Sequence, residues 1–129
     1  MKFNWNREAQ QDGGDEALRR SLADIASEAW RLDRVIDKTL LRMDPMDAQR
    51  FLGQYRWFRR KVDDALSKAD MLLVDLTGQE YSVGMAASPL NIDEFDEDDL
   101  EVEQMVEPII MSRGTVIKTG SVMLRPKKS

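Results

Sequence analysis

The sequence contains no cysteine and no histidine, and only 7% of its residues are aromatic. The missing residue types remove disulfides, thiol nucleophiles, imidazole general bases and the most common zinc ligands. These absences favour a protein that is not an enzyme and that needs no catalytic residue, no metal and no cofactor. Paired carboxylates are the less favoured route to catalysis, because nothing in the sequence points to a shared pocket.

The chain also lacks a long hydrophobic run, since no stretch approaches the roughly 18 apolar residues that span a membrane. Residues 1–15 have no apolar core of the kind found in a signal peptide. With 129 residues and a net charge of −5, the sequence predicts a soluble cytoplasmic protein of one domain or two small pieces. Nucleic-acid binding is not expected, because phosphate contacts need a basic surface.

The charges are distributed unevenly along the chain. Residues 93–107 hold nine acidic side chains and no basic one, whereas residues 108–129 hold five basic and no acidic ones. The acidic run Asp93–Asp99 within this segment predicts a solvated loop, with a cation site or a docking segment for a basic partner as alternatives; calcium loops usually contain a Gly, and none occurs between Asn91 and Pro108. The run Arg59-Arg60-Lys61 likewise predicts a solvated face, with contact to an acidic partner as the alternative.

Apolar residues follow a helical period over 16–73, after a segment, 1–15, that we expect to be disordered. The first helix is expected to start near Asp15 as its N-cap, and its apolar positions alternate in steps of four and three, as in a coiled-coil seam. Asp44 and Pro45 break this pattern and start a second helix. The two helices carry more apolar area than one hairpin can bury, which predicts that two chains pair into a four-helix bundle. The residues expected at this homodimer interface are Leu18, Leu22, Ile25, Leu32, Ile36, Phe51, Tyr55, Phe58 and Val62.

Strand patterns begin near Ala69 and define a small β domain over 74–125, followed by a basic tail, 126–129. We expect strands at 72–76, 79–83, 85–90, 102–111, 115–118 and 121–124. Pro108 predicts an edge or a bulge within the longest of them, and Thr119-Gly120 predicts another bulge. The predicted fold class is therefore α+β: a helical hairpin that forms a dimeric coiled coil or four-helix bundle, followed by a small C-terminal β-wing module.

This order of parts and two motifs resemble the GrpE family, the nucleotide exchange factors of DnaK-type chaperones. The family's bundle ends in a pattern like L-x-K-x-G-V followed by G-x-x-F-D-P, and this chain has Leu66-Ser67-Lys68-Ala69-Asp70-Met71 and then Gly78-Gln79-Glu80-Tyr81-Ser82-Val83. The family's final strands, roughly V-x-E-V-L-Q-x-G-Y and R-V-L-R-P-A-x-V-x-V, are similar to 102–110 and 115–124. The chain departs from the family in five places: D-P is Ser82-Val83, G-Y is Ile109-Ile110, R-P-A is Lys118-Thr119-Gly120, the H-E-A motif is absent, and the first helix is shorter than the family's long stalk.

The resemblance implies a co-chaperone whose β module binds the ATPase domain of a DnaK-type chaperone and promotes ADP release without a titrating group or a cofactor. The partner-binding residues that it implies are Gly78, Tyr81, Val83, Gly84, Met85, Pro108, Ile109 and Ile110. Purely structural roles, as turn glycines and as a core tyrosine, are the other interpretation of Gly78, Gly84 and Tyr81. The departures leave an alternative function open, a dimeric GrpE-like adaptor or scaffold without exchange activity.

Overall fold

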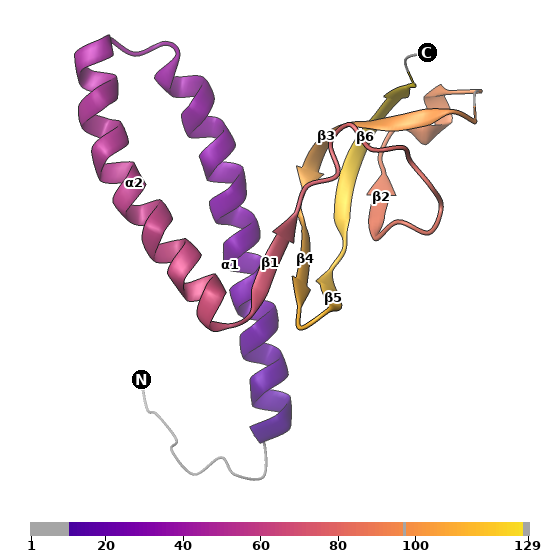
Figure 1. Ribbon diagram of the computed structural model, residues 1–129, viewed down its shortest axis with the longest axis horizontal. Helices are drawn as coiled ribbons and strands as arrows, with labels where there is room; N and C mark the ends of the chain where they lie inside the picture. The colour runs from indigo at the N-terminus through magenta and orange to yellow at the C-terminus, as the bar shows by residue number, and fades with distance from the viewer. Residues whose placement is uncertain (1–10, 97, 128–129) are drawn as a thin grey trace.

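A computed structural model describes residues 11–96 and 98–127 and shows two long helices followed by six strands in two small sheets (Figure 1). Helices α1 (Gln11–Leu40) and α2 (Pro45–Lys68) form a hairpin. The strands follow directly from the end of α2 and lie to one side of the hairpin. The predicted α+β class is thereby confirmed.

The start of α1 differs from the prediction. The chain is already helical at Gln11, so Asp15 lies inside the helix and does not cap it. Residues 11–15 are thus part of α1, and the rest of the segment expected to be disordered, 1–10, lies outside the described residues. A helix that has nucleated gains one hydrogen bond for each added residue, and this gain offsets the roughly 1 kcal/mol that a glycine costs in a helix.

Helix α2 begins and ends where local chemistry predicts. The Asp44 carboxylate accepts a hydrogen bond from the Met46 amide at 3.2 Å, and Pro45 occupies the first turn, where its missing N–H costs nothing. After the helix, Asp70 adopts a left-handed backbone conformation with φ 53°. This residue turns the chain into strand β1 (Met71–Val74) without an intervening loop.

The strands after residue 99 form one long two-stranded ribbon that bends in the middle. One side of the ribbon consists of β3 (Leu100–Glu107) and β4 (Ile109–Ser112), and the other consists of β5 (Thr115–Lys118) and β6 (Gly120–Pro126). β3 pairs with β6 and β4 pairs with β5, both antiparallel. β1 adds antiparallel to β4, and β2 (Ala87–Pro89) adds parallel to β6, so that each half of the ribbon becomes a three-stranded sheet.

Pro108 and Gly120 explain the bend. Pro108 cannot donate a ladder hydrogen bond, so the single strand predicted at 102–111 is divided into β3 and β4, which belong to different sheets. Across the ribbon, a Cβ atom built on Gly120 would lie only 2.7 Å from the carbonyl oxygen of Glu107 and 3.0 Å from Cγ1 of Ile109. The bend therefore depends on a proline in one strand and on the lack of a side chain in the other.

The strand predicted at 79–83 is also wrong. This segment forms only an isolated bridge between Glu80 and Glu101, because Gly78, with φ 85°, turns the chain just before it. The Gly78 amide donates to the carbonyl of Val102 at 2.8 Å, so the segment still follows the edge of β3. The strand expected at 85–90 is shortened to β2. The acidic run 93–99 starts in a short 3-10 helix, η2 (Ile92–Glu94), and its described residues after Glu94 have irregular backbone up to β3.

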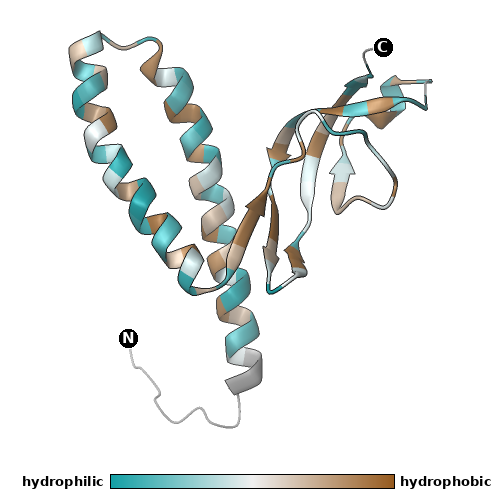
Figure 2. Cartoon of the chain, in the orientation of Figure 1, coloured by the Kyte–Doolittle hydropathy of each residue, from teal (hydrophilic) through white to brown (hydrophobic). Residues whose placement is uncertain are grey.

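Two apolar clusters hold these parts together. The first fills the β module, and its most deeply buried members are Val102, Met105, Val122 and Leu124. The second joins the helices to the sheet of β1, β4 and β5, in which β1 and β4 are built mostly of hydrophobic residues (Figure 2). Its buried members are Ala23 and Ala26 of α1, Leu66 of α2, Met71 of β1 and Ile110 of β4.

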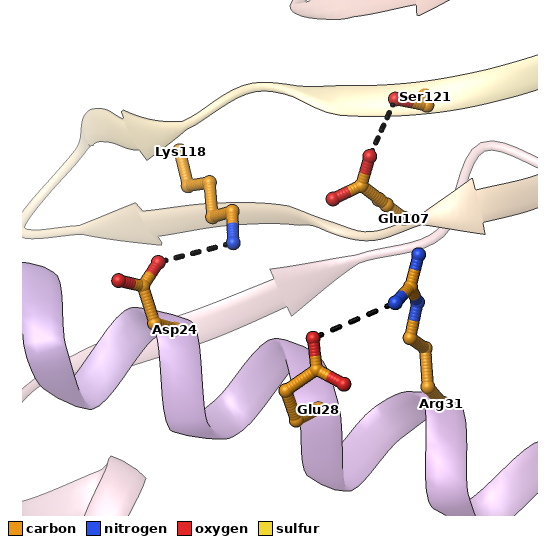
Figure 3. Close-up of polar contacts among 6 residues, drawn as sticks. All are labelled: Asp24, Glu28, Arg31, Glu107, Lys118 and Ser121. Atoms are coloured by element: carbon orange, nitrogen blue, oxygen red, sulfur yellow. Dashed lines mark hydrogen bonds and ion pairs between the residues drawn. The ribbon is translucent and has the colours of Figure 1, made fainter.

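Polar contacts from α1 to the strands lie around the second cluster. The ion pair between Lys118 and Asp24, at 3.1 Å, joins β5 to the helix (Figure 3). The Arg34 guanidinium donates to the carbonyl oxygen of Met105 at 2.8 Å and stacks over the Trp30 ring. These polar contacts connect helix α1 to both halves of the ribbon.

We expect Gly120→Ala to lower the free energy of unfolding by about 1–3 kcal/mol, because the new methyl group would overpack against the Glu107 carbonyl. Gly84→Ala is the matched control, since a Cβ at Gly84 meets no atom within 4 Å and its effect should stay within about 0.5 kcal/mol. Urea unfolding followed by circular dichroism measures both variants. Equal losses of stability would contradict the close approach at the bend.

Candidate functional site

The residues predicted at a dimer interface separate into two groups. Leu22, Ile36, Tyr55 and Val62 are buried or half-buried within the hairpin. The other five form what we call the outer apolar face, and all are exposed, Leu18 by 69% and Ile25 by 65% of its surface. The members of the outer apolar face are Leu18, Ile25, Leu32, Phe51 and Phe58.

The members of the outer apolar face form one stripe on each helix of the hairpin. Its three α1 members are seven residues apart, and so are its two α2 members, so each set lies along one stripe of its helix. The stripes that contain Ala26 and Leu66 pack toward the sheet. Phe51 and Phe58 belong to the α2 stripe that also holds Leu66, and Phe58 lines the cavity between the helices and the sheet, so the α2 set is exposed at the edge of the hairpin seam. Large exposed apolar surfaces are typical of protein contact sites.

Tyr55 lies in the seam of the hairpin beside this face. Its ring centroid is 6.2 Å from that of Phe51 and 5.8 Å from that of Phe58. Its hydroxyl is buried and has no hydrogen-bond partner among the described residues. The nearby Asp33 carboxylate is bound by Arg59 at 2.7 Å. Burial of the phenol, followed by the adjacent Asp33, raises the pKa of Tyr55 to about 12.

A small cavity of about 70 Å³ lies between the two helices and the sheet. Its lining includes Ala26, Trp30, Asp33, Phe58, Val62 and Leu73. This volume is far below the roughly 300 Å³ at which ligand pockets begin. This cavity is therefore too small to be a small-molecule pocket, and the hairpin is better suited to contacts through its surface.

The residues that the resemblance assigns to partner binding are not brought together on one surface. Val83 is 91% exposed, and Gly78 and Gly84 are exposed on the same loop. Tyr81 and Met85 are half-buried and pack on the core of the β module. This loop, between β1 and β2, lies on the side of the module away from the hairpin (Figure 1).

Pro108, Ile109 and Ile110 require a correction. All three are buried at the bend of the ribbon, and Ile110 has no exposed surface. Their side chains belong to the two apolar clusters and to the joint between them, so they present no contact surface to a partner. The resemblance assigns them to partner binding as part of one strand with an edge or a bulge at Pro108, whereas the structure divides that strand between two sheets.

Sequence reasoning also missed an exposed apolar patch on the sheet of β1, β4 and β5. Leu72 and Val116 are exposed, and each pairs with the half-buried Met111. A shallow groove of about 420 Å³, bordered by the Asp70–Arg113 ion pair, adjoins Leu72 and Met111. The strand period was the available signal, since Leu72 alternates with the inward-facing Met71 and Leu73.

In the ranges 11–96 and 98–127, no three acidic side chains come together as a group that could hold a metal ion. No helix in the same ranges is both long and apolar enough to cross a membrane.

Comparisons of the chain with protein-family models, with curated proteins and with solved structures found no match. The function proposed for this protein rests on these surfaces and on the resemblance in the sequence.

We expect Tyr55→Phe to raise the free energy of unfolding at pH 7 by about 1 kcal/mol, because the variant removes a buried hydroxyl that lacks a partner. The pKa of this phenol is about 12 in the folded protein and 10.0 ordinarily, so the folded state holds the proton more tightly. The free energy of unfolding is therefore unaffected by the titration of Tyr55 below pH 10 and falls as the pH rises toward about 12, because the folded state resists ionisation of this phenol. Urea unfolding between pH 7 and pH 12 measures this loss.

Tyr81→Phe is the control, because that phenol is not part of the hairpin seam. Stability should decline less steeply above pH 10 in Tyr55→Phe than in the wild type or in Tyr81→Phe. Parallel declines in all three proteins would show that the Tyr55 phenol does not titrate as its burial predicts.

Proposed function

We propose that this protein is a GrpE-like co-chaperone that acts in the cytoplasm as a homodimer, binds the ATPase domain of a DnaK-type chaperone and promotes ADP release. The observation that carries the proposal is the junction at Ala69, where a helical hairpin continues directly into a β module. The motif that resembles the family, from Leu66 to Tyr81, spans this junction. Beyond it, the loop with Val83 extends from the side of the module away from the helices.

The proposed mechanism is mechanical. The exposed side chain of Val83, with Gly78 and Gly84 on the same loop, would contact the ATPase domain when its nucleotide cleft is open. A ligand that binds the open state better than the closed state shifts the population toward the open state. Bound ADP then leaves faster and ATP enters. No acid, base or metal takes part, so the protein itself would not be an enzyme.

The outer apolar face supports the homodimer. Its five side chains would be removed from water if two hairpins packed into a four-helix bundle. Each large apolar side chain contributes roughly 1.5–3 kcal/mol when it is fully buried. The pairing would also place the Tyr55 seam at the centre of the bundle, where coiled-coil packing is closest.

A GrpE-like adaptor without exchange activity is the second candidate. The burial of Pro108, Ile109 and Ile110 favours it, since three of the eight residues that the resemblance assigns to partner binding are not exposed. In this case the dimer would present other surfaces to a different partner. The two candidates differ in whether the protein changes nucleotide release at all.

The wild-type protein should accelerate the release of labelled ADP from a DnaK-type chaperone of the same organism. Val83→Asp should weaken this effect at least about tenfold, because a charge would replace an exposed apolar contact. Leu90→Asp is the matched control on another exposed loop of the β module and should keep the activity. Stopped-flow fluorescence measures the release rates. If the wild-type protein accelerates release from no DnaK-type chaperone of its organism, the exchange function is refuted.

Light scattering at micromolar concentration should give about twice the chain mass of 14.9 kDa. Ile25→Glu combined with Leu32→Glu should reduce the mass to that of one chain, because two charges would be buried in the bundle. Leu72→Glu is the control on an exposed apolar site outside the hairpin and should leave the dimer intact. A single-chain mass for the wild type would refute the bundle.

A further inference from the structure

A second face of α2 is exposed and has a different chemistry from the outer apolar face. Its members are spaced by three or four residues up to Trp57, and the last two follow Trp57 by three and by four residues, so they lie along one side of the helix. All of them are exposed, and no described element covers them. We call this the basic face of α2, and its members are Met46, Arg50, Gly53, Trp57, Arg60 and Lys61.

The cations of this face have no acidic partner within the described part of the chain. The ion pair that α2 forms across the hairpin uses Arg59, which points toward Asp33. Arg50, Arg60 and Lys61 take part in none of the ion pairs. Three acidic residues, Asp47, Asp63 and Asp64, also lie three or four residues from one of these cations, near the two ends of the stripe. An acidic chain with a net charge of −5 thus keeps a local basic surface.

Trp57 gives this surface an anchor. Its side chain is 63% exposed, and Lys61 lies 5.4 Å from the centre of its ring, a cation–π contact that holds the charge beside the indole. Gly53 lies one turn before Trp57, and a Cβ there would meet no atom within 4 Å, so the backbone is open to close approach. Tryptophan and arginine are the residues most enriched at the energetic centres of protein interfaces.

We propose that the basic face of α2 binds an acidic polypeptide segment that carries apolar residues between its carboxylates. The carboxylates would pair with Arg50, Arg60 and Lys61, and an apolar residue would pack on Trp57 beside Gly53. The face is separate from the Val83 loop and from the outer apolar face. The inference therefore extends beyond nucleotide exchange and does not depend on it.

The chemistry of the whole chain favours a polypeptide over other polyanions. A nucleic acid is a long polyanion that would extend beyond α2, and the acidic residues of 93–107 would repel it. A short acidic segment can bind to one face of α2 alone. A membrane-bound helix needs a wide apolar face directed at the lipid. In α2 the apolar stripe that includes Val62 and Leu66 packs within the protein.

The test measures the anisotropy of a fluorescein-labelled synthetic peptide of glutamates with a phenylalanine at every fourth position. The control peptide has glutamine in place of each glutamate. We expect the full chain to bind the acidic peptide at least about tenfold more tightly than the control peptide, with an affinity that falls as salt is added. Equal binding of the two peptides would overturn the proposal.

Variants then locate the site. Arg50→Glu with Lys61→Glu, and separately Trp57→Ala, should each weaken binding of the acidic peptide at least about tenfold. Lys38→Glu with Arg42→Glu is the matched control, since both residues are exposed cations outside this face, and binding should change less than about twofold. The helical circular dichroism signal should be the same in all variants, because none of the replaced residues is buried.

Two further probes test whether the basic face of α2 prefers a nucleic acid or a membrane to an acidic peptide. A single-stranded DNA oligonucleotide and vesicles of phosphatidylserine and phosphatidylcholine are measured under the same salt conditions. Weaker binding of both than of the acidic peptide supports the proposal. Tighter binding of either, abolished by Arg50→Glu with Lys61→Glu, would assign the face to that ligand and overturn the proposal. Unchanged peptide binding in that double variant would also overturn it.

Discussion

The packing of Ile110 against Ala23 and Ala26 is the contact on which the rest of the arrangement depends. Ile110 lies on the central strand of its sheet and has no exposed surface, so α1 can approach it only where its own side chains are small. The contact brings Leu66 of α2 to the same cluster. This cluster thereby decides which side of the hairpin faces the strands. The basic face of α2 is left exposed to solvent.

The bend of the ribbon is the second feature on which the arrangement depends, and it lies within the strands. Because the chain is divided at Pro108 and lacks a side chain at Gly120, one half of the ribbon can pack on the helices while the other half builds its own core. The loop with Val83 belongs to the second half and lies away from the hairpin (Figure 1). The protein therefore presents three surfaces of different chemistry: an apolar face, a basic face and an exposed loop. This separation suits a protein that works by binding partners.

Much of this architecture could be predicted from the sequence. The apolar period, with its break at Asp44 and Pro45, is a local signal, and the hairpin follows it closely. The errors lie where a single residue has a long-range effect: Gly78 turns the chain out of the strand expected at 79–83, and Pro108 divides the longest strand. The burial of Ile109 and Ile110 follows from that division, so their placement on a partner surface could not have been corrected from the sequence alone.

The sequence by itself determined which residues are apolar, how they repeat along each helix, and where helix chemistry changes to strand chemistry near Ala69. Only the tertiary structure decided which of those apolar residues are covered. Leu22 and Ile25 belong to the same coiled-coil pattern, yet one is half-buried within the hairpin and the other remains exposed. The physical reason is that a heptad pattern specifies a stripe on a helix, whereas burial depends on the elements that pack against it, and here the sheet lies on one side of the hairpin only.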